Sequence, residues 1–418
     1  MADPNAFDSR YPSIEDLRAR AKSRIPKFAF EYLDSGCNEE VNLRKNTEDL
    51  QQIELVPRYL RTHKPPSLET TLFGHRYSVP FGVAPIGLQG LIWPGAPELL
   101  AKAATANNLP FILSTVSTAS IERIAKITEG KAWFQLYNPA EDALREDLLT
   151  RAEQAGIEVL VLLSDVPSFG YRHNDIRNGL SMPPKMSLRN VLNILGHGQW
   201  ALNTLAHGQP EFQTLKPYIP KNLSLSQLGA FMNQTFSGKL SAEKIAPIRD
   251  RWKGKLVLKG VASAEDAALA AALGFDGLIV SNHGGRQIDA GESSIRSLDR
   301  VLSAVNTEQI TVMLDSGLRS GPDIARALAR GAQFTFMGRP FMYGVAALGA
   351  KGPDHTIELL RRQLQQVLEQ LCCENPTELS QFWPNEVSLR NSTFSRCLRL
   401  CATATRKARG ARGHGFYS

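Results

Sequence analysis

The sequence predicts an α/β fold, a (β/α)8 TIM barrel with an N-terminal helical extension and a long insertion after strand 4. Three observations favour it. Short apolar runs recur eight times between about residues 78 and 339, helix-like stretches separate them, and nearly every run ends in a polar or glycine residue. Strands alternating with helices over this length favour a closed barrel over a doubly wound sheet.

The eight expected strands share a short apolar core that ends at a turn signal. They are residues 80–85, 110–115, 132–137, 158–165, 255–260, 276–282, 310–317 and 333–339. Stretches such as "AEDAALAAALG" and "PDIARALARG" begin at Asp or Pro and end at glycine, as helices do. Residues 356–373 carry one apolar stripe and are expected to pack outside the barrel as its closing helix.

Residues 1–75 precede the barrel and contain two amphipathic segments, 13–22 and 27–34, so we expect a helical extension there. The barrel itself is expected over 76–375. About 90 residues separate the fourth and fifth runs, far more than an ordinary connection. Within this gap, residues 177–230 are expected to form either a lid packed on the barrel or a loop that faces a membrane or a partner.

The net charge of +7 is concentrated at the C-terminus, because seven Arg and Lys residues and no acidic residue follow Glu386. We therefore expect residues 376–418 to form a basic tail, either solvated or lying on an anionic membrane surface. The rest of the chain is balanced in charge. Nucleic-acid binding is not expected.

No run of eighteen apolar residues occurs, and the first twenty residues are polar and mixed in charge. This pattern argues against a signal peptide or a spanning helix. We therefore expect a cytoplasmic protein that is either free in solution or peripheral on the inner face of the membrane. The five cysteines have no paired metal spacing and are expected to be free thiols.

Polar or special-backbone residues gather where the expected strands end. Since a barrel carries its active site at the carboxyl ends of its strands, this ring predicts a catalytic pocket. Its members are Pro85, Ile86, Gly87, Ser114, Gln135, Tyr137, Asp165, Lys259, Ser281, His283, Arg286, Asp315, Gly338 and Arg339.

The last two strands predict a phosphate site. "DSGLRSG" (315–321) and "GRP" (338–340) are glycine-containing turns that carry Arg319 and Arg339 near helix starts. Barrels usually bind phosphate there, where backbone amides and an arginine reach its oxygens. The ligand is therefore expected to carry a phosphate, held at Gly317, Arg319, Gly338 and Arg339.

The stretch "SNHGGRQID" (281–289) predicts acid–base chemistry. His283 can take a proton near neutral pH, and Asp165 is the carboxylate available to stabilise the imidazolium. Arg286 can bind a substrate carboxylate through two parallel hydrogen bonds; its alternative is a structural ion pair with Asp289. The glycines after His283 would leave space for a flat ligand.

Lys259 lies on an apolar strand, where it would be an unpaired buried cation unless an electron-rich group sat beside it. A flavin ring, which becomes anionic on reduction, would meet that need.

The motifs "WFQLY", "LVLKGVASAEDA", "SNHGGRQID", "LDSGLRSGPDI" and "MGRP" resemble those of the FMN-dependent enzymes that oxidise 2-hydroxy acids, among them glycolate oxidase, flavocytochrome lactate dehydrogenase and mandelate dehydrogenase. The similarity runs from about residue 10 to 373 with near-constant spacing. The resemblance implies a barrel that binds FMN and oxidises a small 2-hydroxy acid.

The resemblance also implies a role for each matching residue. His283 would be the base, Asp165 its partner, Arg286 and Arg172 the carboxylate binders, and Tyr32 and Tyr137 further substrate contacts. Lys259 would lie at the N1 and O2 side of FMN. The other cofactor contacts would be Ser114, Gln135 and Ser281 at the ring, Asp315 at the ribityl chain, Gly317, Arg319, Gly338 and Arg339 at the phosphate, and Pro85, Ile86 and Gly87 beside N5.

The chain departs from the family pattern at three points. Leu163 stands where the family usually has threonine, which removes one expected flavin hydrogen bond. Pro85-Ile86-Gly87 replaces Pro-Thr-Ala or Pro-Thr-Gly, and Gly87 is similar to the dehydrogenase branch. Val116 stands where glycolate oxidase has tryptophan, which leaves room for a larger substrate side chain.

These observations predict a dehydrogenase that passes electrons from an S-2-hydroxy acid, lactate- or mandelate-like, through FMN to a quinone-type acceptor. Two alternatives stay open: an oxidase that produces hydrogen peroxide, and a non-catalytic flavin-binding protein at the membrane. Whether the α-hydrogen leaves as a proton or as a hydride, His283 takes one proton. The resemblance further implies a homotetramer and a membrane contact through 177–230.

Overall fold

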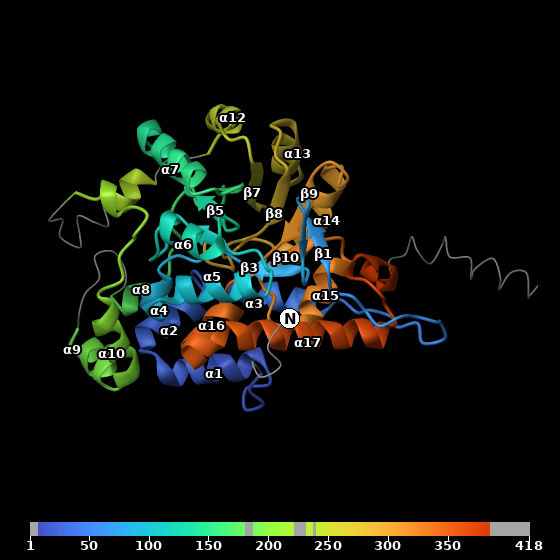
Figure 1. Ribbon diagram of the computed structural model, residues 1–418, viewed down its shortest axis with the longest axis horizontal. Helices are drawn as coiled ribbons and strands as arrows, with labels where there is room; N and C mark the ends of the chain where they lie inside the picture. The colour runs from blue at the N-terminus through green and yellow to red at the C-terminus, as the bar shows by residue number, and fades with distance from the viewer. Residues whose placement is uncertain (1–6, 180–186, 221–230, 237–239, 385–418) are drawn as a thin grey trace, which may run out of the picture.

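The computed structural model describes residues 7–179, 187–220, 231–236 and 240–384, and its centre is the expected eight-stranded barrel (Figure 1). Neighbours in the sheet follow the order β3-β10-β9-β8-β7-β6-β5-β4, all parallel, and a parallel bridge between Val83 and Phe111 joins β3 to β4. The strands are β3 (Phe81–Val83), β4 (Ile112–Ser114), β5 (Trp133–Leu136), β6 (Val159–Leu163), β7 (Lys255–Val261), β8 (Gly277–Val280), β9 (Thr311–Leu314) and β10 (Phe334–Met337). The barrel prediction is confirmed.

The strands are continuous apolar runs because both of their faces are buried. On β6, Val159 and Val161 belong to the cluster inside the barrel, whereas Leu160 and Leu162 pack in the cluster shared with the surrounding helices. Trp133 and Phe336 fill the interior with their rings 5.3 Å apart. The barrel is therefore a packed core, and ligands have room only at its ends.

Helices surround the strands and several of them begin at a serine cap. The side chains of Ser120, Ser263 and Ser320 each accept a hydrogen bond from the amide three residues later. The surrounding helices are α5 (Ala96–Ala106), α6 (Ile121–Thr128), α7 (Asp142–Gln154), α12 (Ala242–Arg251), α13 (Ala264–Ala272), α14 (Ser294–Ala304), α15 (Gly321–Ala329) and α16 (Arg339–Leu348).

A long helix, α17 (Gly352–Leu371), packs against α15 and α16 on the outside of the barrel, as expected for the closing helix. Its apolar stripe is buried, with Leu360 and Leu364 fully covered. Short elements complete this half of the chain: η3 (Gly349–Lys351) precedes α17 and η4 (Pro376–Phe382) follows it.

Three helices and a hairpin precede the barrel: α1 (Ile14–Arg24), α2 (Lys27–Asp34), α3 (Val41–Gln51), β1 (Thr70–Leu72) and β2 (His75–Tyr77). The first two helices were expected; α3 and the hairpin were not. Helix α3 has little apolar periodicity because polar residues fill its buried face, where Asn46 Nδ2 donates to Asn282 Oδ1 over 2.8 Å. The hairpin strands have three residues each, too few to show a pattern.

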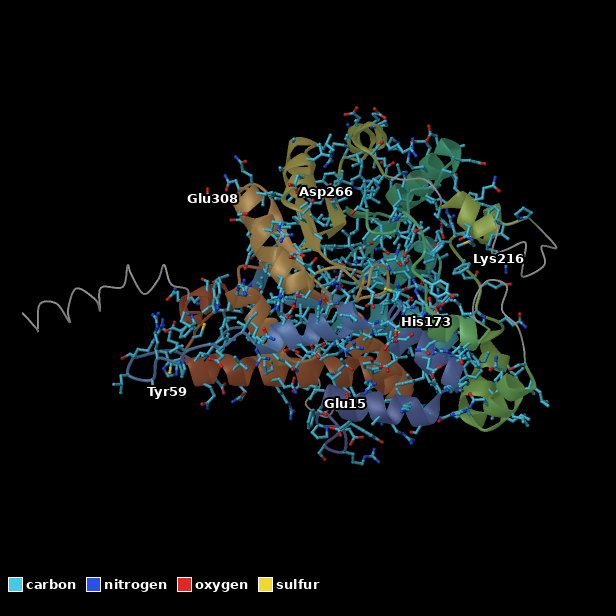
Figure 2. The ribbon with its side chains drawn as sticks, turned by 180° about the vertical axis from the view of Figure 1, so that it is seen from behind. Glu15, Tyr59, His173, Lys216, Asp266 and Glu308 are labelled. Atoms are coloured by element: carbon cyan, nitrogen blue, oxygen red, sulfur yellow. The ribbon has the colours of Figure 1, made fainter. Side chains whose placement is uncertain are left out.

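The insertion contains α8 (His173–Arg177), α9 (Leu188–Leu195), α10 (Gly198–His207) and η2 (Lys216–Tyr218). Helices α9 and α10 lie beside α2 and α4 (Gln89–Ile92) at one end of the molecule, opposite the loop that carries Tyr59 (Figures 1 and 2). Trp200 anchors α10, because its Nε1 donates to Ile92 O over 3.0 Å and its ring meets Phe28 edge-on.

The returning part of the insertion packs on the barrel, while α9 and α10 expose leucines. Phe212, Leu215, Met232 and Phe236 form one apolar cluster with Tyr137 of the barrel. The exposed residues share one side of α9 and the end of α10; they are Leu188, Val191, Leu192, Leu195, Leu202 and Leu205. Lid-like packing and outward-facing apolar surface therefore occur in different parts of the insertion.

Folded structure extends past residue 375, where the basic tail was expected to begin. Leu379 and Phe382 of η4 are buried, and Phe382 O accepts a hydrogen bond from Val56 N. The basic residues themselves, and Cys397 and Cys401, lie outside the described residues; Cys37, Cys372 and Cys373 are free and buried. Across the described part of the chain, no helix combines the length and apolarity needed to span a bilayer.

Candidate active site

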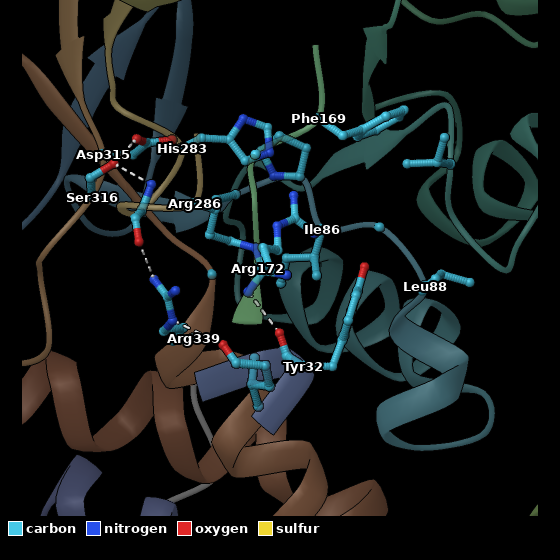
Figure 3. Close-up of a pocket in the computed structure, with 18 of the residues that line it drawn as sticks. Tyr32, Ile86, Leu88, Phe169, Arg172, His283, Arg286, Asp315, Ser316 and Arg339 are labelled. Atoms are coloured by element: carbon cyan, nitrogen blue, oxygen red, sulfur yellow. Dashed lines mark hydrogen bonds between the residues drawn. The ribbon is translucent and has the colours of Figure 1, made fainter. Parts of the chain in front are cut away.

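A cavity of about 440 Å³ opens at the carboxyl ends of the barrel strands. Arg339 and Ser316 lie at one end of it and Leu88 at the other, with Arg172, Arg286 and Tyr32 between them (Figure 3). Most of the expected site residues line this cavity: Tyr32, Pro85, Ile86, Gly87, Tyr137, Arg172, Lys259, His283, Arg286, Asp315, Gly317, Arg319, Gly338 and Arg339. Asp165, Ser114, Gln135 and Ser281 do not line it and lie behind its wall.

His283 and Asp165 are paired as expected. His283 Nδ1 lies 3.0 Å from Asp165 Oδ1, and Gln287 Nε2 fixes the loop by donating to Asp165 O over 3.1 Å. A hydrogen on Nδ1 bonded to the carboxylate leaves Nε2 as the free lone pair of the neutral ring. The ring can therefore accept a proton at Nε2 while Asp165 steadies the cation that forms.

The electrostatic surroundings keep His283 neutral before it reacts. Burial lowers the pKa of His283, the Asp165 carboxylate opposes that shift, and the charges of Lys259 and Arg172 add to it. Burial disfavours the ionised form of Asp165, but His283 and Lys259 outweigh it, so the pKa of Asp165 lies below its usual range. The pair thus combines a neutral base with an ionised partner.

The glycines after His283 allow close packing and a tight turn. A Cβ on Gly284 would lie 2.5 Å from Arg339 Nη1, and one on Gly285 would lie 2.7 Å from the backbone of Leu43. Both glycines also have positive φ, as does His283 itself at 57°. The two glycines therefore give close packing and a tight turn; Gly284 also lines the cavity, and the expectation that they make room for a flat ligand stays a prediction.

Arg286 is held by carbonyl oxygens and not by an acid. Its Nη1 donates to Tyr32 O and Ser35 O over 2.7 and 2.9 Å, and its guanidinium lies 5.0 Å from the Tyr32 ring centre. Asp289 instead accepts hydrogen bonds from the amides of Glu39 and Asn42, so the alternative of an Arg286–Asp289 ion pair is not found. Burial lowers the pKa of Arg286 to about 10, helped by Arg172. Such a cation favours an incoming carboxylate.

Arg172 lines the same cavity from the loop before α8. Its Nη1 lies 3.6 Å from Asp175 Oδ2, and its Nη2 makes a long 3.4 Å contact with Gln287 Oε1. Its Nε is buried and has no hydrogen-bond partner among the described residues. Arg172 therefore has donor capacity to spare for a ligand.

Lys259 is not an unpaired cation, because the electron-rich group beside it is the carboxylate of Asp315. Its Nζ lies 3.0 Å from Asp315 Oδ2 and donates to Ser281 Oγ over 2.9 Å. Burial opposes its charge, yet Asp315 and Asp165 raise its pKa above the usual range. Asp315 follows β9, which β8 alone separates from β7, so the strand order of the barrel brings it beside Lys259. The burial of Lys259 alone is no argument for a flavin.

The phosphate expectation has independent support from two arginines that form no ion pair with an acidic residue in the described part of the chain. Arg339 is buried and donates to the carbonyl oxygens of Leu33, Gly284 and Ser35 over 2.9 to 3.0 Å. Burial, with the charge of Arg319, lowers its pKa to about 9. Among the described residues, the Arg319 side chain makes one hydrogen bond, from Nη1 to the neighbouring Leu318 O. Two cations with neutral partners at one end of the cavity fit a phosphate group.

Behind the cavity wall, Ser114 and Gln135 are register partners on β4 and β5 and each is 2 % exposed. Gln135 Nε2 is a buried donor without a hydrogen-bond partner among the described residues. Because an orphan donor of this kind is costly, it points to an acceptor on a bound molecule. The carbonyl edge of a flavin fits this donor, and Leu163 beside it on β6 adds none.

Several residues of the cavity were missed by the sequence analysis, among them residues from the segment between β6 and β7. Phe212 and Met232 come from the returning insertion, and Phe169 and Asp175 from the loop and helix after β6. None lies at the end of a predicted strand. The apolar pattern of the insertion showed that it covers something, but not that it reaches this cavity.

The match to a known protein family covers the part of the chain that forms the barrel and the cavity. A family model described as FMN-dependent dehydrogenase matches residues 21–384. The cavity described above lies within that range, as do all the expected site residues.

Solved structures agree with this match. A crystal structure of the monotopic membrane protein (S)-mandelate dehydrogenase is 35 % identical, covers 90 % of this chain and 100 % of its own, and has a TM-score of 0.85. A soluble mutant of the membrane-associated (S)-mandelate dehydrogenase from Pseudomonas putida is 34 % identical over 89 % of this chain and 99 % of its own, with a TM-score of 0.75. A mandelate oxidase structure is 30 % identical over 88 % and 97 %, with a TM-score of 0.74. The chain therefore belongs to the family of FMN-dependent 2-hydroxy acid dehydrogenases and oxidases.

Proposed function

We propose that the protein oxidises an S-2-hydroxy acid with a lactate- or mandelate-like side chain to the 2-keto acid, and passes the two electrons through FMN to a quinone-type acceptor. The observation that carries the proposal is the paired His283 and Asp165 beside two arginines that have spare donors. A neutral base next to a carboxylate-binding pair is the arrangement that this oxidation needs.

In the proposed mechanism the arginines bind the substrate first. Arg286 and Arg172 hold the carboxylate from two sides, which fixes the 2-hydroxy carbon relative to His283. Tyr32 and Tyr137 also line the cavity and would contact the carboxylate or the hydroxyl. Burial raises the pKa of Tyr137 above its usual range, so Tyr137 stays protonated and acts as a hydrogen-bond donor.

His283 then takes one proton at Nε2, and Asp165 stabilises the imidazolium through Nδ1. FMN, when bound, supplies a two-electron acceptor for the carbon that is oxidised. The cavity wall excludes water from the proton being moved, because the apolar residues Leu88, Phe212 and Met232 cover the far end.

The residues proposed to hold FMN divide between its ends. Gly317, Arg319, Gly338 and Arg339 would bind the phosphate, and Asp315 the ribityl chain while it also pairs with Lys259. Ser114, Gln135, Ser281 and Lys259 would contact the ring system, and Pro85, Ile86 and Gly87 would border N5. The unsatisfied Gln135 donor and the acid-free arginines support this division.

The acceptor is proposed to be membrane-bound because the insertion exposes an apolar face. Leu188, Leu192 and Leu195 recur on one side of α9, and such a face binds the interfacial region of a bilayer. The similarity to a protein described as a monotopic membrane dehydrogenase supports the same reading. A cytoplasmic enzyme held at the inner face of the membrane could reduce a quinone there.

The proposal is tested by mixing the FMN-loaded protein anaerobically with 2-hydroxy acids of increasing size. Loss of the flavin absorbance with one of them supports it, and a flavin that stays oxidised with all of them contradicts it. Reoxidation then identifies the acceptor. Slow reoxidation in air together with fast reoxidation by a quinone analogue would indicate a dehydrogenase. Fast formation of hydrogen peroxide in air would indicate an oxidase, which is the second candidate because of the similarity to mandelate oxidase.

A further inference from the structure

An acidic side chain lines the cavity together with the two arginines proposed to bind the substrate carboxylate. Asp175, on α8, lines the same cavity as Arg172 and Arg286 and is 8 % exposed. No role is implied for it by the motifs at the strand ends. A buried carboxylate at a site that has to receive another carboxylate needs an explanation, because like charges repel there.

The hydrogen-bond geometry around Asp175 is incomplete. Its Oδ2 lies 3.6 Å from Arg172 Nη1, while its Oδ1 is buried with no hydrogen-bond partner in the described structure. Arg172 Nε is likewise buried without an acceptor. Asp175 lies three residues after Arg172 in the chain, and this spacing places its carboxylate beside the Nη1 edge of the Arg172 guanidinium. The Nε donor of Arg172 is left free within the described structure.

The charges explain why an acid is useful here. Arg172 lowers the pKa of Arg286, which shows that the two guanidinium groups repel each other across the cavity. Burial raises the pKa of Asp175, and the charges of Arg286 and Arg172 offset only part of that rise, while Glu31 adds to it. The cluster of two cations and one carboxylate has one positive charge left, which matches one substrate carboxylate.

We propose that Asp175 is a positioning residue, which holds the Arg172 guanidinium against the α8 side of the cavity so that Arg172 and Arg286 face one substrate carboxylate. The proposal rests on the proposed function, since it assigns Asp175 to the carboxylate end of that same site. Asp175 itself does not touch the substrate. It acts through Arg172 and offsets the repulsion between the arginines before the substrate arrives.

The test is steady-state kinetics of the FMN-loaded holoenzyme with Asp175→Asn, which keeps the size and removes the charge. Loss of the ion pair should raise KM by roughly tenfold and change kcat by less than about threefold, because substrate binding weakens while the base is untouched. Asp175→Glu keeps the charge and should recover most of the affinity. Asp142→Asn is the matched control, since it removes a carboxylate that pairs with Arg145 on α7, outside the cavity lining, and should leave KM unchanged.

A double-mutant cycle separates positioning from a general structural role. In an Arg172→Ala background, Asp175→Asn should change KM by less than about twofold, because the group through which it acts is gone. An unchanged or lower KM in Asp175→Asn alone would overturn the proposal, as would an equal rise in both backgrounds. If Asp175→Asn does not retain FMN, binding of a 2-keto acid to Asp175→Glu, followed by flavin absorbance, decides: near wild-type affinity supports the proposal and a tenfold loss contradicts it.

Failure of the proposal for Asp175 can be distinguished from failure of the proposed function. If the wild-type holoenzyme oxidises no 2-hydroxy acid, the function proposed above fails and the 2-keto acid titration still measures carboxylate binding. If the wild type turns over and Asp175→Asn behaves like it, only the role of Asp175 is wrong.

Discussion

His283 Nδ1 and Asp165 Oδ1 lie 3.0 Å apart although 118 residues separate them in the chain, and this pair orients the free Nε2 of the histidine. Asp165 follows β6 and His283 follows β8, and β7 lies between these strands in the sheet. Gly260 makes the approach possible on β7, because a Cβ there would lie 2.6 Å from the Asp165 side chain. The pair therefore depends on the order of the strands in the barrel.

The first prediction concerns pH. Burial lowers the pKa of His283, with Asp165 opposing, so the net shift is below the usual value of 6.5. The neutral form is the base, so kcat/KM should be flat near neutrality and fall as pH drops through a value below 6.5. A pH–rate profile measures this. An acidic limb centred above pH 7 would show that another group titrates or that His283 is stabilised as the cation.

The second prediction concerns FMN affinity. Arg319→Ala removes from the phosphate end a guanidinium that has no acidic partner in the described structure. The dissociation constant of FMN should rise by about 10- to 100-fold, because that factor corresponds to the free energy of one hydrogen bond to a charged group. Fluorescence titration of the apoprotein measures it. Arg326→Ala is the control, because Arg326 pairs with Asp323 and does not line the cavity. Equal loss in both variants would indicate damage to the fold and no phosphate contact.

The third prediction concerns substrate size. Val116 lies opposite Gly87, where an added Cβ would be only 2.9 Å from Val116 Cγ2. Val116→Trp should fill the apolar end and lower kcat/KM for mandelate relative to glycolate by roughly tenfold or more. The ratio of the two kcat/KM values measures the effect. Val191→Trp, on the exposed face of α9, should leave the ratio unchanged; an unaltered ratio in Val116→Trp would place the substrate side chain elsewhere.

The fourth prediction concerns the membrane. Wild-type protein should sediment with anionic phosphatidylglycerol vesicles, and the double variant Leu192→Glu with Leu195→Glu should remain in the supernatant, because two charges on the apolar face of α9 oppose insertion. Leu269→Glu, at an exposed leucine of α13, is the control and should sediment as the wild type does. Wild-type protein that stays in the supernatant contradicts the assignment of this face to a bilayer.

The barrel could be predicted from the sequence because its strands are buried on both faces and leave a strong apolar pattern. Helix α3 could not, because three of its four buried residues, Asn42, Asn46 and Asp49, are polar and bind other polar groups, and only Leu50 joins the apolar core. Polar burial of this kind leaves no periodic signal.

The site could be predicted where residues follow strands, and it could not where the partners are set by tertiary structure. His283, Arg286 and Arg339 follow strands and line the cavity. The pairing of Lys259 with Asp315 and the packing of Gly284 against Arg339 depend on distances across the barrel. For the same reason Asp175, which follows no strand, was missed.

Anaerobic reduction of the flavin in wild type and in His283→Gln is the measurement that tests the central claim most directly. His283→Gln should retain FMN, because the phosphate end is untouched, and should reduce it with the best 2-hydroxy acid about 10²- to 10⁴-fold more slowly. His173→Gln, a histidine outside the cavity lining, is the control and should react at the wild-type rate. Reduction of the flavin in His283→Gln at the wild-type rate would contradict the assignment of His283 as the base.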